Sequence, residues 1–218
     1  MMAMRDSRNA DEEASAAARW DRRYGAAVAP PFGEAPNDYL RMICAREDFT
    51  ARSSLCLADG DGRNGAWLAG QGLAVTAVDV SAVATERAKA LDGRRGVSVE
   101  RLTADLADWS PGPGRTWEAV FLIYLQGTSA LRRRALDVGK AALAPGGWLV
   151  VEGFAKAQGP RPDMGPDDPD RLYDLAELRQ ALPGLQVVEA LAGRVCLDEG
   201  IRHRGEAEVV RFAARRMA

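Results

Sequence analysis

The chain has 218 residues, of which 47% are hydrophobic, and its formal net charge is -2. This length predicts a single domain over residues 1–218 with a sizeable core, and the small net charge argues against a nucleic-acid partner. The chain has three scattered cysteines, an N-terminus without the apolar core of a signal peptide, and no apolar run of membrane-spanning length. These features favour a cytoplasmic protein without a membrane partner or a metal site.

The N-terminal region is predicted to begin with a tail and to continue as two helices. Residues 1–9 are polar, charged and terminal, a composition typical of disorder. Residues 12–24 carry Trp20 and Tyr24 at helical spacing, so both rings can share one face. Two prolines end this helix, and residues 36–49 are predicted to form the next one before the sheet begins.

The most informative segment spans residues 54–81. An apolar strand over 55–58 ends in a glycine turn, a helix over 63–71 follows, and a second strand over 73–78 ends at Asp79. In parallel α/β sheets, ligands bind beyond the carboxyl ends of the strands, where a carboxylate can hold a ribose diol. The segment therefore predicts a site for a nucleoside cofactor.

Two classes of cofactor fit this segment. Gly60, Gly62 and Gly65 have the G-x-G-x-x-G spacing of dinucleotide-binding turns, which is a weak signal by itself. Asp59 and Asp61, however, would repel an anionic pyrophosphate and attract the sulfonium and ammonium cations of S-adenosylmethionine (SAM). The turn therefore favours SAM over a nicotinamide or flavin dinucleotide.

Strands and helices continue to alternate along the rest of the chain. Ser81 is a suitable N-cap for the next helix. The further predicted elements are strands over 97–102, 117–125, 148–154, 185–191 and 206–214, and helices over 129–143 and 172–182. Arginines 132–134 splay around a helix axis, which predicts a solvated surface.

Residues 155–170 contain six prolines and glycines, too many for a helix or a strand. A loop of this length is uncommon and often closes over an active site, and a disordered insertion is the alternative.

This organisation resembles the class I SAM-dependent methyltransferases over residues 20–216. The motifs Gly60-Asp-Gly-Arg-Asn64, Ala77-Val-Asp-Val-Ser81, Ala104-Asp-Leu106 and Leu143-Ala-Pro-Gly-Gly147 are similar to those of the tellurite-resistance type, a branch near the thiopurine methyltransferases. The resemblance implies a three-layer, Rossmann-like α/β fold with a seven-stranded, mostly parallel sheet of order 3-2-1-4-5-7-6 and a final antiparallel strand. It also implies that N-terminal helices within residues 10–50 lie over the active site.

The resemblance further implies which residues hold SAM. Gly60 and Gly62 are expected close to its methionine part, Asp79 at the ribose hydroxyls, and Asp105 at the adenine amino group. Surface carboxylates that cap helices are the alternative for both aspartates. The predicted cofactor-binding set is Cys56, Ala58, Asp59, Gly60, Gly62, Asn64, Asp79, Val80, Asp105 and Leu106, with Val80 and Leu106 flanking the adenine ring.

Two positions depart from the family pattern, which usually has an acidic residue in place of Cys56 and a glycine in place of Ala58. The acid helps to position the ammonium end of the cofactor, and the methyl group of Ala58 narrows the approach or opposes a positive φ. Asp59 or Asp61 could supply the missing charge. Without such compensation, SAM binding is weakened or lost.

The C-terminal residues Glu199 to Arg204, and Arg211 on the last strand, resemble the substrate-side elements of the tellurite-resistance type. His203 is expected to accept a proton, while Arg204 and Arg211 hold an anion. Tyr124 ends a strand where the acceptor would lie. The predicted catalytic residues are therefore His203, Arg204, Arg211 and Tyr124, and a solvated, charged hairpin tip is the alternative for residues 199–204.

The leading hypothesis is a SAM-dependent methyltransferase that acts on a small molecule: a thiol, a chalcogen oxyanion or an anionic metabolite. Methyl transfer requires mainly in-line alignment, because the sulfonium is already activated. The segment Ile123-Tyr-Leu-Gln126 lacks the Asn-Pro-Pro-Tyr and Pro-Cys patterns of the enzymes that methylate nucleic-acid bases. The alternatives are a methyltransferase-like binding or regulatory protein with weak or no turnover, and an oxidoreductase that uses a dinucleotide.

Overall fold

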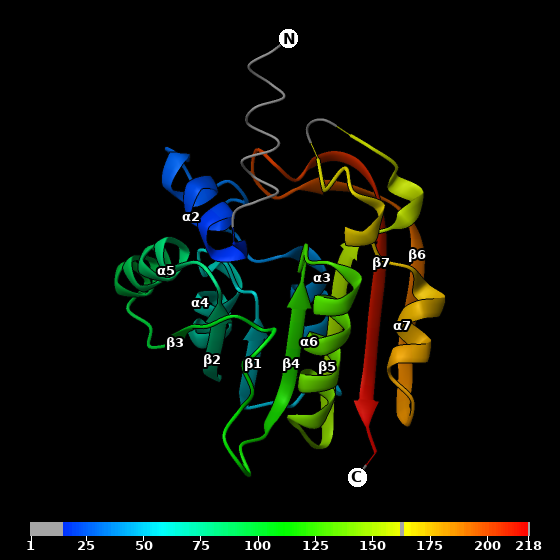
Figure 1. Cartoon of the computed structure of the whole chain (residues 1–218). Helices are drawn as coiled ribbons and strands as arrows, with labels where there is room; N and C mark the ends of the chain where they lie inside the picture. The colour runs from blue at the N-terminus through cyan, green and yellow to red at the C-terminus, as the bar shows by residue number, and fades with distance from the viewer. Residues whose placement is uncertain (1–14, 162–163, 218) are drawn as a thin grey trace.

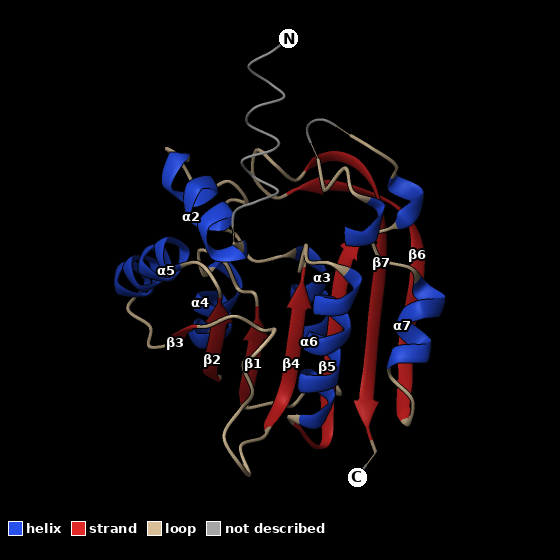
Figure 2. Cartoon of the chain, viewed as in Figure 1, coloured by secondary structure: helices blue, strands red, loops and turns tan. Residues whose placement is uncertain are grey.

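The computed structural model describes residues 15–161 and 164–217. The disordered tail predicted over residues 1–9 lies outside this range, as does the predicted start of the first helix. Helices cover both faces of a central sheet, as Figures 1 and 2 show. No helix within the described range is long and apolar enough to cross a membrane.

The sheet has the strand order β3-β2-β1-β4-β5-β7-β6. The first five strands pair in parallel, and β7 is antiparallel to both of its neighbours. The strands are β1 (Ser53–Leu57), β2 (Ala74–Asp79), β3 (Glu100–Thr103), β4 (Trp117–Ile123), β5 (Leu143–Phe154), β6 (Leu185–Asp198) and β7 (Arg204–Arg216). The predicted α/β fold, with its seven-stranded, mostly parallel sheet, is confirmed.

The helices begin where the sequence provides side-chain caps. The Oγ atom of Ser81 accepts the backbone N–H of Ala84 at 3.0 Å, and the side chain of Asn37 accepts that of Leu40 at 2.8 Å. The helices are α2 (Ala16–Ala26), α3 (Asp38–Cys44), α4 (Arg63–Gly70), α5 (Ala82–Arg95), α6 (Ser129–Ala141) and α7 (Leu175–Ala181), with 3-10 turns η1 (Lys156–Gln158) and η2 (Pro169–Arg171).

Alternate residues of the central strands supply two separate cores. Leu55 and Leu122 belong to the core beneath α6 and α7, whereas Cys56 and Phe121 belong to the core beneath α3 and α4. This division follows from the two-residue repeat of a strand that is buried on both faces. It also fixes which strand residues can reach the ends of the sheet.

Several elements differ in their bounds from the sequence prediction. Helix α3 is shorter than the predicted 36–49, and β5 begins at Leu143, so it includes the predicted Pro-Gly-Gly turn. Strands β6 and β7 extend beyond their predicted ends and pair from Leu185↔Arg216 to Asp198↔Arg204. Since β5 pairs with β7 only as far as Phe154↔Val209, the remaining pairs form a two-stranded ribbon that projects past the sheet.

The prediction that the three arginines lie on a solvated surface is wrong for Arg132. Its guanidinium is buried and donates to the backbone carbonyls of Gly127, Asp170 and Leu172. Arg132 therefore fastens the start of α6 to the end of the loop over residues 155–170. The base of that loop is also closed, because Lys156 donates its N–H to the carbonyl of Tyr173 at 2.9 Å. The lid function stays a prediction.

Candidate functional site

A cavity of about 290 Å³ lies beyond the carboxyl ends of β1, β2 and β4. Figure 1 shows α2 and the β6–β7 ribbon on this side of the sheet. Helix α2 contributes Trp20 and Tyr24 to the wall, and the tip of the ribbon contributes His203. The cavity therefore has a sheet floor and a roof made from the N-terminal and C-terminal parts of the chain.

Eight of the predicted site residues line this cavity: Ala58, Asn64, Asp79, Val80, Asp105, Leu106, Tyr124 and His203. The other six, Cys56, Asp59, Gly60, Gly62, Arg204 and Arg211, are not on its wall.

Asp79 is a half-buried carboxylate of the cavity wall. Its Oδ2 atom accepts the N–H of Gly60 at 2.8 Å, and its Oδ1 atom accepts the N–H of Ser81 at 2.9 Å. Burial raises the pKa of Asp79 to about 6, against the lowering effect of these two hydrogen bonds. Each oxygen keeps a further lone pair, so the carboxylate can accept hydrogen bonds from a diol. Asp105 also lines the cavity, and its Oδ1 atom accepts the N–H of Ala107 at 2.9 Å.

Two non-glycine residues adopt a positive φ at the floor of the cavity. Ala58, after β1, has φ 59°, and Tyr124, after β4, has φ 53°. This conformation costs an L-residue about 1–2 kcal/mol. Ala58 therefore adopts a positive φ despite the opposition of its methyl group. Such strain concentrates at functional sites.

Asp59 stabilises the turn and does not face the cavity, contrary to its predicted role. Its buried carboxylate lies 2.5 Å from the guanidinium of Arg101 and accepts the N–H of Gly65 at 3.2 Å. The N-cap of α4, Gly62, has no side chain, so Asp59 provides the acceptor that this helix start would otherwise lack. Its charge is therefore not available to a cofactor.

Asp61 also fails to supply the charge that Cys56 lacks. It lines a second hollow, together with Arg87 and Arg94, away from the main cavity. Burial raises its pKa to about 6. Cys56 itself is only 2% exposed and belongs to the apolar core beneath α3 and α4.

The two glycines of the turn are required by packing within the protein. A Cβ atom on Gly60 would lie 2.3 Å from the hydroxyl of Tyr24, and one on Gly62 would lie 2.6 Å from the Cβ of Ala88. Both residues have positive φ. The turn is therefore packed between α2 and α5, and the position of its glycines beside the methionine part of SAM stays a prediction.

At the other end of the cavity, His203 is enclosed by aromatic rings. Its ring centroid lies 4.9 Å from that of Phe32, 4.2 Å from Tyr124 and 5.2 Å from Phe154. Desolvation, with a smaller effect of Arg63, lowers the pKa of His203 to about 3. The imidazole is therefore neutral at physiological pH.

The two C-terminal arginines are not placed to hold an anion in the cavity. The side chain of Arg204 is 78% exposed and lies 3.8 Å from Asp198. Arg211 forms an ion pair with Glu152 at 2.7 Å, and its guanidinium lies over the ring of Tyr39. Both expectations are corrected because the strand register directs Arg204 to solvent and pairs Arg211 with Glu152 across β5 and β7.

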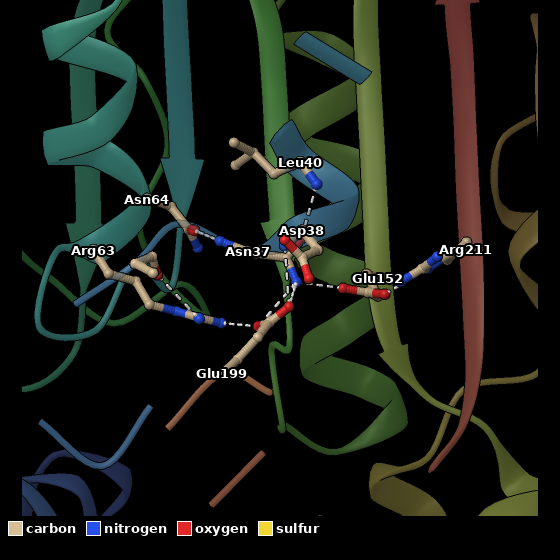
Figure 3. A network of polar contacts seen from close by, with 9 residues as sticks. Asn37, Asp38, Leu40, Arg63, Asn64, Glu152, Glu199 and Arg211 are labelled. Atoms are coloured by element: carbon tan, nitrogen blue, oxygen red, sulfur yellow. Dashed lines mark hydrogen bonds and ion pairs between the residues drawn. The ribbon is translucent and has the colours of Figure 1, made fainter. Parts of the chain in front are cut away.

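A buried polar network, shown in Figure 3, joins the ribbon to the rest of the site. Glu199 pairs with Arg63 at 2.6 Å and accepts hydrogen bonds from the side chain of Asn37 and the N–H of Asp38, both at 3.0 Å. Asn37 also donates to Glu152. The network thus connects α3, the start of α4, β5 and the ribbon tip.

Sequence reasoning missed Asn37, Arg63 and Glu152, and it named Glu199 only as the first residue of the segment that ends at Arg204. One signal was present, since Glu152 and Arg211 each interrupt an apolar strand. A buried charge requires a partner of the opposite sign. The other partners are separated by more than a hundred residues, for example 136 between Arg63 and Glu199, so no local pattern indicates them.

The strand order and the position of the cavity define the class I methyltransferase fold. Residues 55–147 match the family model described as a methyltransferase domain. A search of curated protein sequences finds no match.

Solved structures of low sequence identity share the fold. One, from work on the conversion of a disulfide bond into a thioacetal group during echinomycin biosynthesis, has a TM-score of 0.72 and 19% identity over 93% of this chain and 92% of that one. TehB from Haemophilus influenzae has a TM-score of 0.66 and 12% identity over 92% of this chain and 66% of its own. The N-methyltransferase NodS from Bradyrhizobium japonicum WM9, in complex with S-adenosyl-L-homocysteine (SAH), has a TM-score of 0.61 and 18% identity over 82% and 83%.

Proposed function

We propose that the protein is a SAM-dependent methyltransferase that acts on a small-molecule acceptor. The observation that carries this proposal is Asp79, a carboxylate at the end of β2 that lines the cavity and has both oxygens oriented by backbone N–H groups. The match of residues 55–147 to a methyltransferase domain supports the same assignment. So does the complex of NodS, a protein of the same fold, with SAH.

The residues of the cavity fit the adenosine part of the cofactor. Asp79 would bind the ribose hydroxyls, Asp105 would receive the adenine amino group, and Val80 and Leu106 would flank the ring. Once bound, SAM supplies a methyl group on a positively charged sulfur atom. Neither Asp59 nor Asp61 reaches this cavity, so Asn64 and the backbone at Ala58 are the groups of the turn that would meet the methionine part.

The opposite end of the cavity would receive the acceptor. Tyr124 and His203 lie there, while α2 and the ribbon tip cover the cavity and reduce its contact with water. Exclusion of water and fixed positioning are the main contributions a protein makes to a reaction whose leaving group is already activated.

Calorimetric titration of the purified protein with SAM, SAH and NADH tests the proposal. We expect both adenosyl compounds to bind with micromolar affinity and NADH to show no binding. Asp79→Asn removes the charge while keeping the shape, so it should weaken SAH binding by about tenfold or more, the range expected for a hydrogen bond to a charged group.

Asp61→Asn is the matched control, because Asp61 lies in the same turn but outside the cavity. Equal effects of the two variants would remove the ribose role of Asp79. Absence of SAM and SAH binding by the unmodified protein would contradict the proposal and favour a regulatory protein of the same fold. NADH binding would favour an oxidoreductase.

A further inference from the structure

We propose that the acceptor is a neutral, flat molecule that presents an O–H, N–H or S–H group to His203 and Tyr124, and not a chalcogen oxyanion or another anion. This inference rests on the proposed function and names the class of acceptor that the same cavity takes.

The first evidence is a pair of buried polar groups that lack partners. His203 is 2% exposed and Tyr124 is 9% exposed. Neither ring nitrogen of His203 nor the hydroxyl of Tyr124 has a hydrogen-bond partner among residues 15–161 and 164–217. Buried polar atoms are nearly always paired, and an unpaired one costs about 1–3 kcal/mol. Both groups line the cavity, so a ligand there can supply the missing partners.

The second evidence is the charge of the surrounding groups. Arg63, which lines the cavity near His203, is paired with Glu199 at 2.6 Å. Arg171, also on the wall, lies 3.5 Å from Asp168, although its Nε atom has no hydrogen-bond partner among the described residues. Because Glu199 neutralises Arg63 and the imidazole of His203 is itself neutral, neither of these two groups offers a free positive charge to an anion beside His203.

The third evidence is the shape of the enclosure. Phe32 and Tyr124, which both line the cavity, lie 4.9 Å and 4.2 Å from His203 between ring centroids, and Phe154 contacts the rings of Tyr124 and His203 without being part of the cavity wall. Aromatic walls bind flat, apolar groups through offset or edge contacts. A neutral imidazole offers one donor and one acceptor, so it can accept a hydrogen bond from a protonated heteroatom.

The transfer step balances with these groups alone and SAM as the methyl donor. The acceptor's heteroatom forms a bond to the methyl carbon, and the carbon–sulfur bond breaks with its electron pair left on sulfur. The proton of the heteroatom passes to the free ring nitrogen of His203, which later releases it to water. Positive charge disappears from sulfur as it appears on the imidazole, so the charge within the cavity is unchanged.

The inference is tested by measuring the binding of two probes that share a naphthalene ring and differ in charge. His203 is the only histidine of the chain, so its ring signals in a proton–carbon NMR spectrum have no competitors. We expect 2-naphthol, added to the SAH-saturated protein, to shift these signals and to bind at least about tenfold more tightly than 2-naphthoate. Tyr124→Phe should weaken 2-naphthol binding by about fivefold to tenfold without changing SAH affinity.

Arg204→Gln is the matched control, because Arg204 is exposed, and it should change neither affinity. Equal or tighter binding of 2-naphthoate would overturn the inference, as would the failure of both probes to move the His203 signals. SAH affinity is measured first in the same sample. If SAH does not bind, the proposed function fails, and the probe comparison without SAH still tests the chemistry of the His203 end.

Discussion

Asp61 is a buried carboxylate that destabilises the folded state at neutral pH. Its Oδ2 atom has no hydrogen-bond partner in the described part of the chain, and burial raises its pKa from 3.8 to about 6. Below pH 4 the group is protonated in both the folded and unfolded states, so it contributes nothing. As the pH rises from 4 to 6, the unfolded chain ionises more readily, and stability is lost.

Asp61→Asn should therefore stabilise the protein above pH 6 by about 1–3 kcal/mol, given that one pKa unit corresponds to 1.36 kcal/mol. The gain should fade as the pH falls from 6 to 4. Urea unfolding of both proteins at several pH values measures this difference. A gain that stays constant across this range would show that the carboxylate is not the cause.

The charge of Asp59 was one reason why the sequence favoured SAM, but in the structure this charge does not face the cavity. The sequence assigned the charges of Asp59 and Asp61 to SAM, but Arg101 neutralises Asp59 and Asp61 lies in another hollow. Arg101 lies 42 residues from Asp59, on β3, so no local pattern indicates the pair. The case for SAM now rests on Asp79 and on the family match.

The wall of the cavity around Asp79 was easier to predict than the wall around His203. Three of its residues, Ala58, Asp79 and Asp105, lie at or just after the end of a strand, and Asn64 lies in the first turn of α4. The ends of the strands therefore bring these residues to one edge of the sheet. Phe32, by contrast, lies in a loop with no periodic pattern, and its contact with His203 depends on tertiary structure.

At the scale of elements, Glu199 fastens the ribbon tip to the body of the protein. Glu199→Ala should cost about 3–5 kcal/mol, because it leaves Arg63 buried without its counter-ion. Hydrogen exchange of residues 197–204 should then accelerate, because the tip loses the side-chain contacts of Glu199 with Arg63 and with Asn37. Denaturant unfolding and exchange mass spectrometry measure the two effects.

Asp198→Ala is the control for this variant, since the neighbouring side chain is 87% exposed. It should change stability by less than about 0.5 kcal/mol. Glu199→Gln, which keeps an acceptor oxygen, should fall between the two. If Glu199→Ala behaves like Asp198→Ala, the ion pair with Arg63 does not hold the tip.

Elements with a clear local pattern of hydrophobic residues were predicted, and the ribbon was not. β4 is a nearly continuous apolar run, and its strand assignment from the sequence agrees with the structure. Residues 192–204 hold two glycines and many charges, so their alternation is lost, yet they pair with β7 or form the turn. Their pairing depends on the antiparallel partner strand, which a local pattern does not contain.

For the whole molecule, bound SAH should raise the melting temperature by mass action. At a concentration one hundred times its dissociation constant, a ligand stabilises the folded state by about 2.7 kcal/mol. For a chain of this size, that corresponds to about 5–10 °C. Thermal unfolding by circular dichroism measures the shift, and NADH at the same concentration should produce none. A shift with NADH equal to that with SAH would point to non-specific stabilisation.

The number of residue pairs in the ribbon sets how far His203 reaches over the cavity. Beyond the last pair with β5, the ribbon continues from Arg194↔Glu208 to Asp198↔Arg204 before the tip. Each pair adds about 3.4 Å of length. Removing one pair would draw the tip back by that distance and also exchange the faces of its side chains, whereas removing two would restore the faces and draw it back by about 7 Å. Removing two pairs would therefore enlarge the His203 end of the cavity without altering Asp79 or Asp105 at its wall.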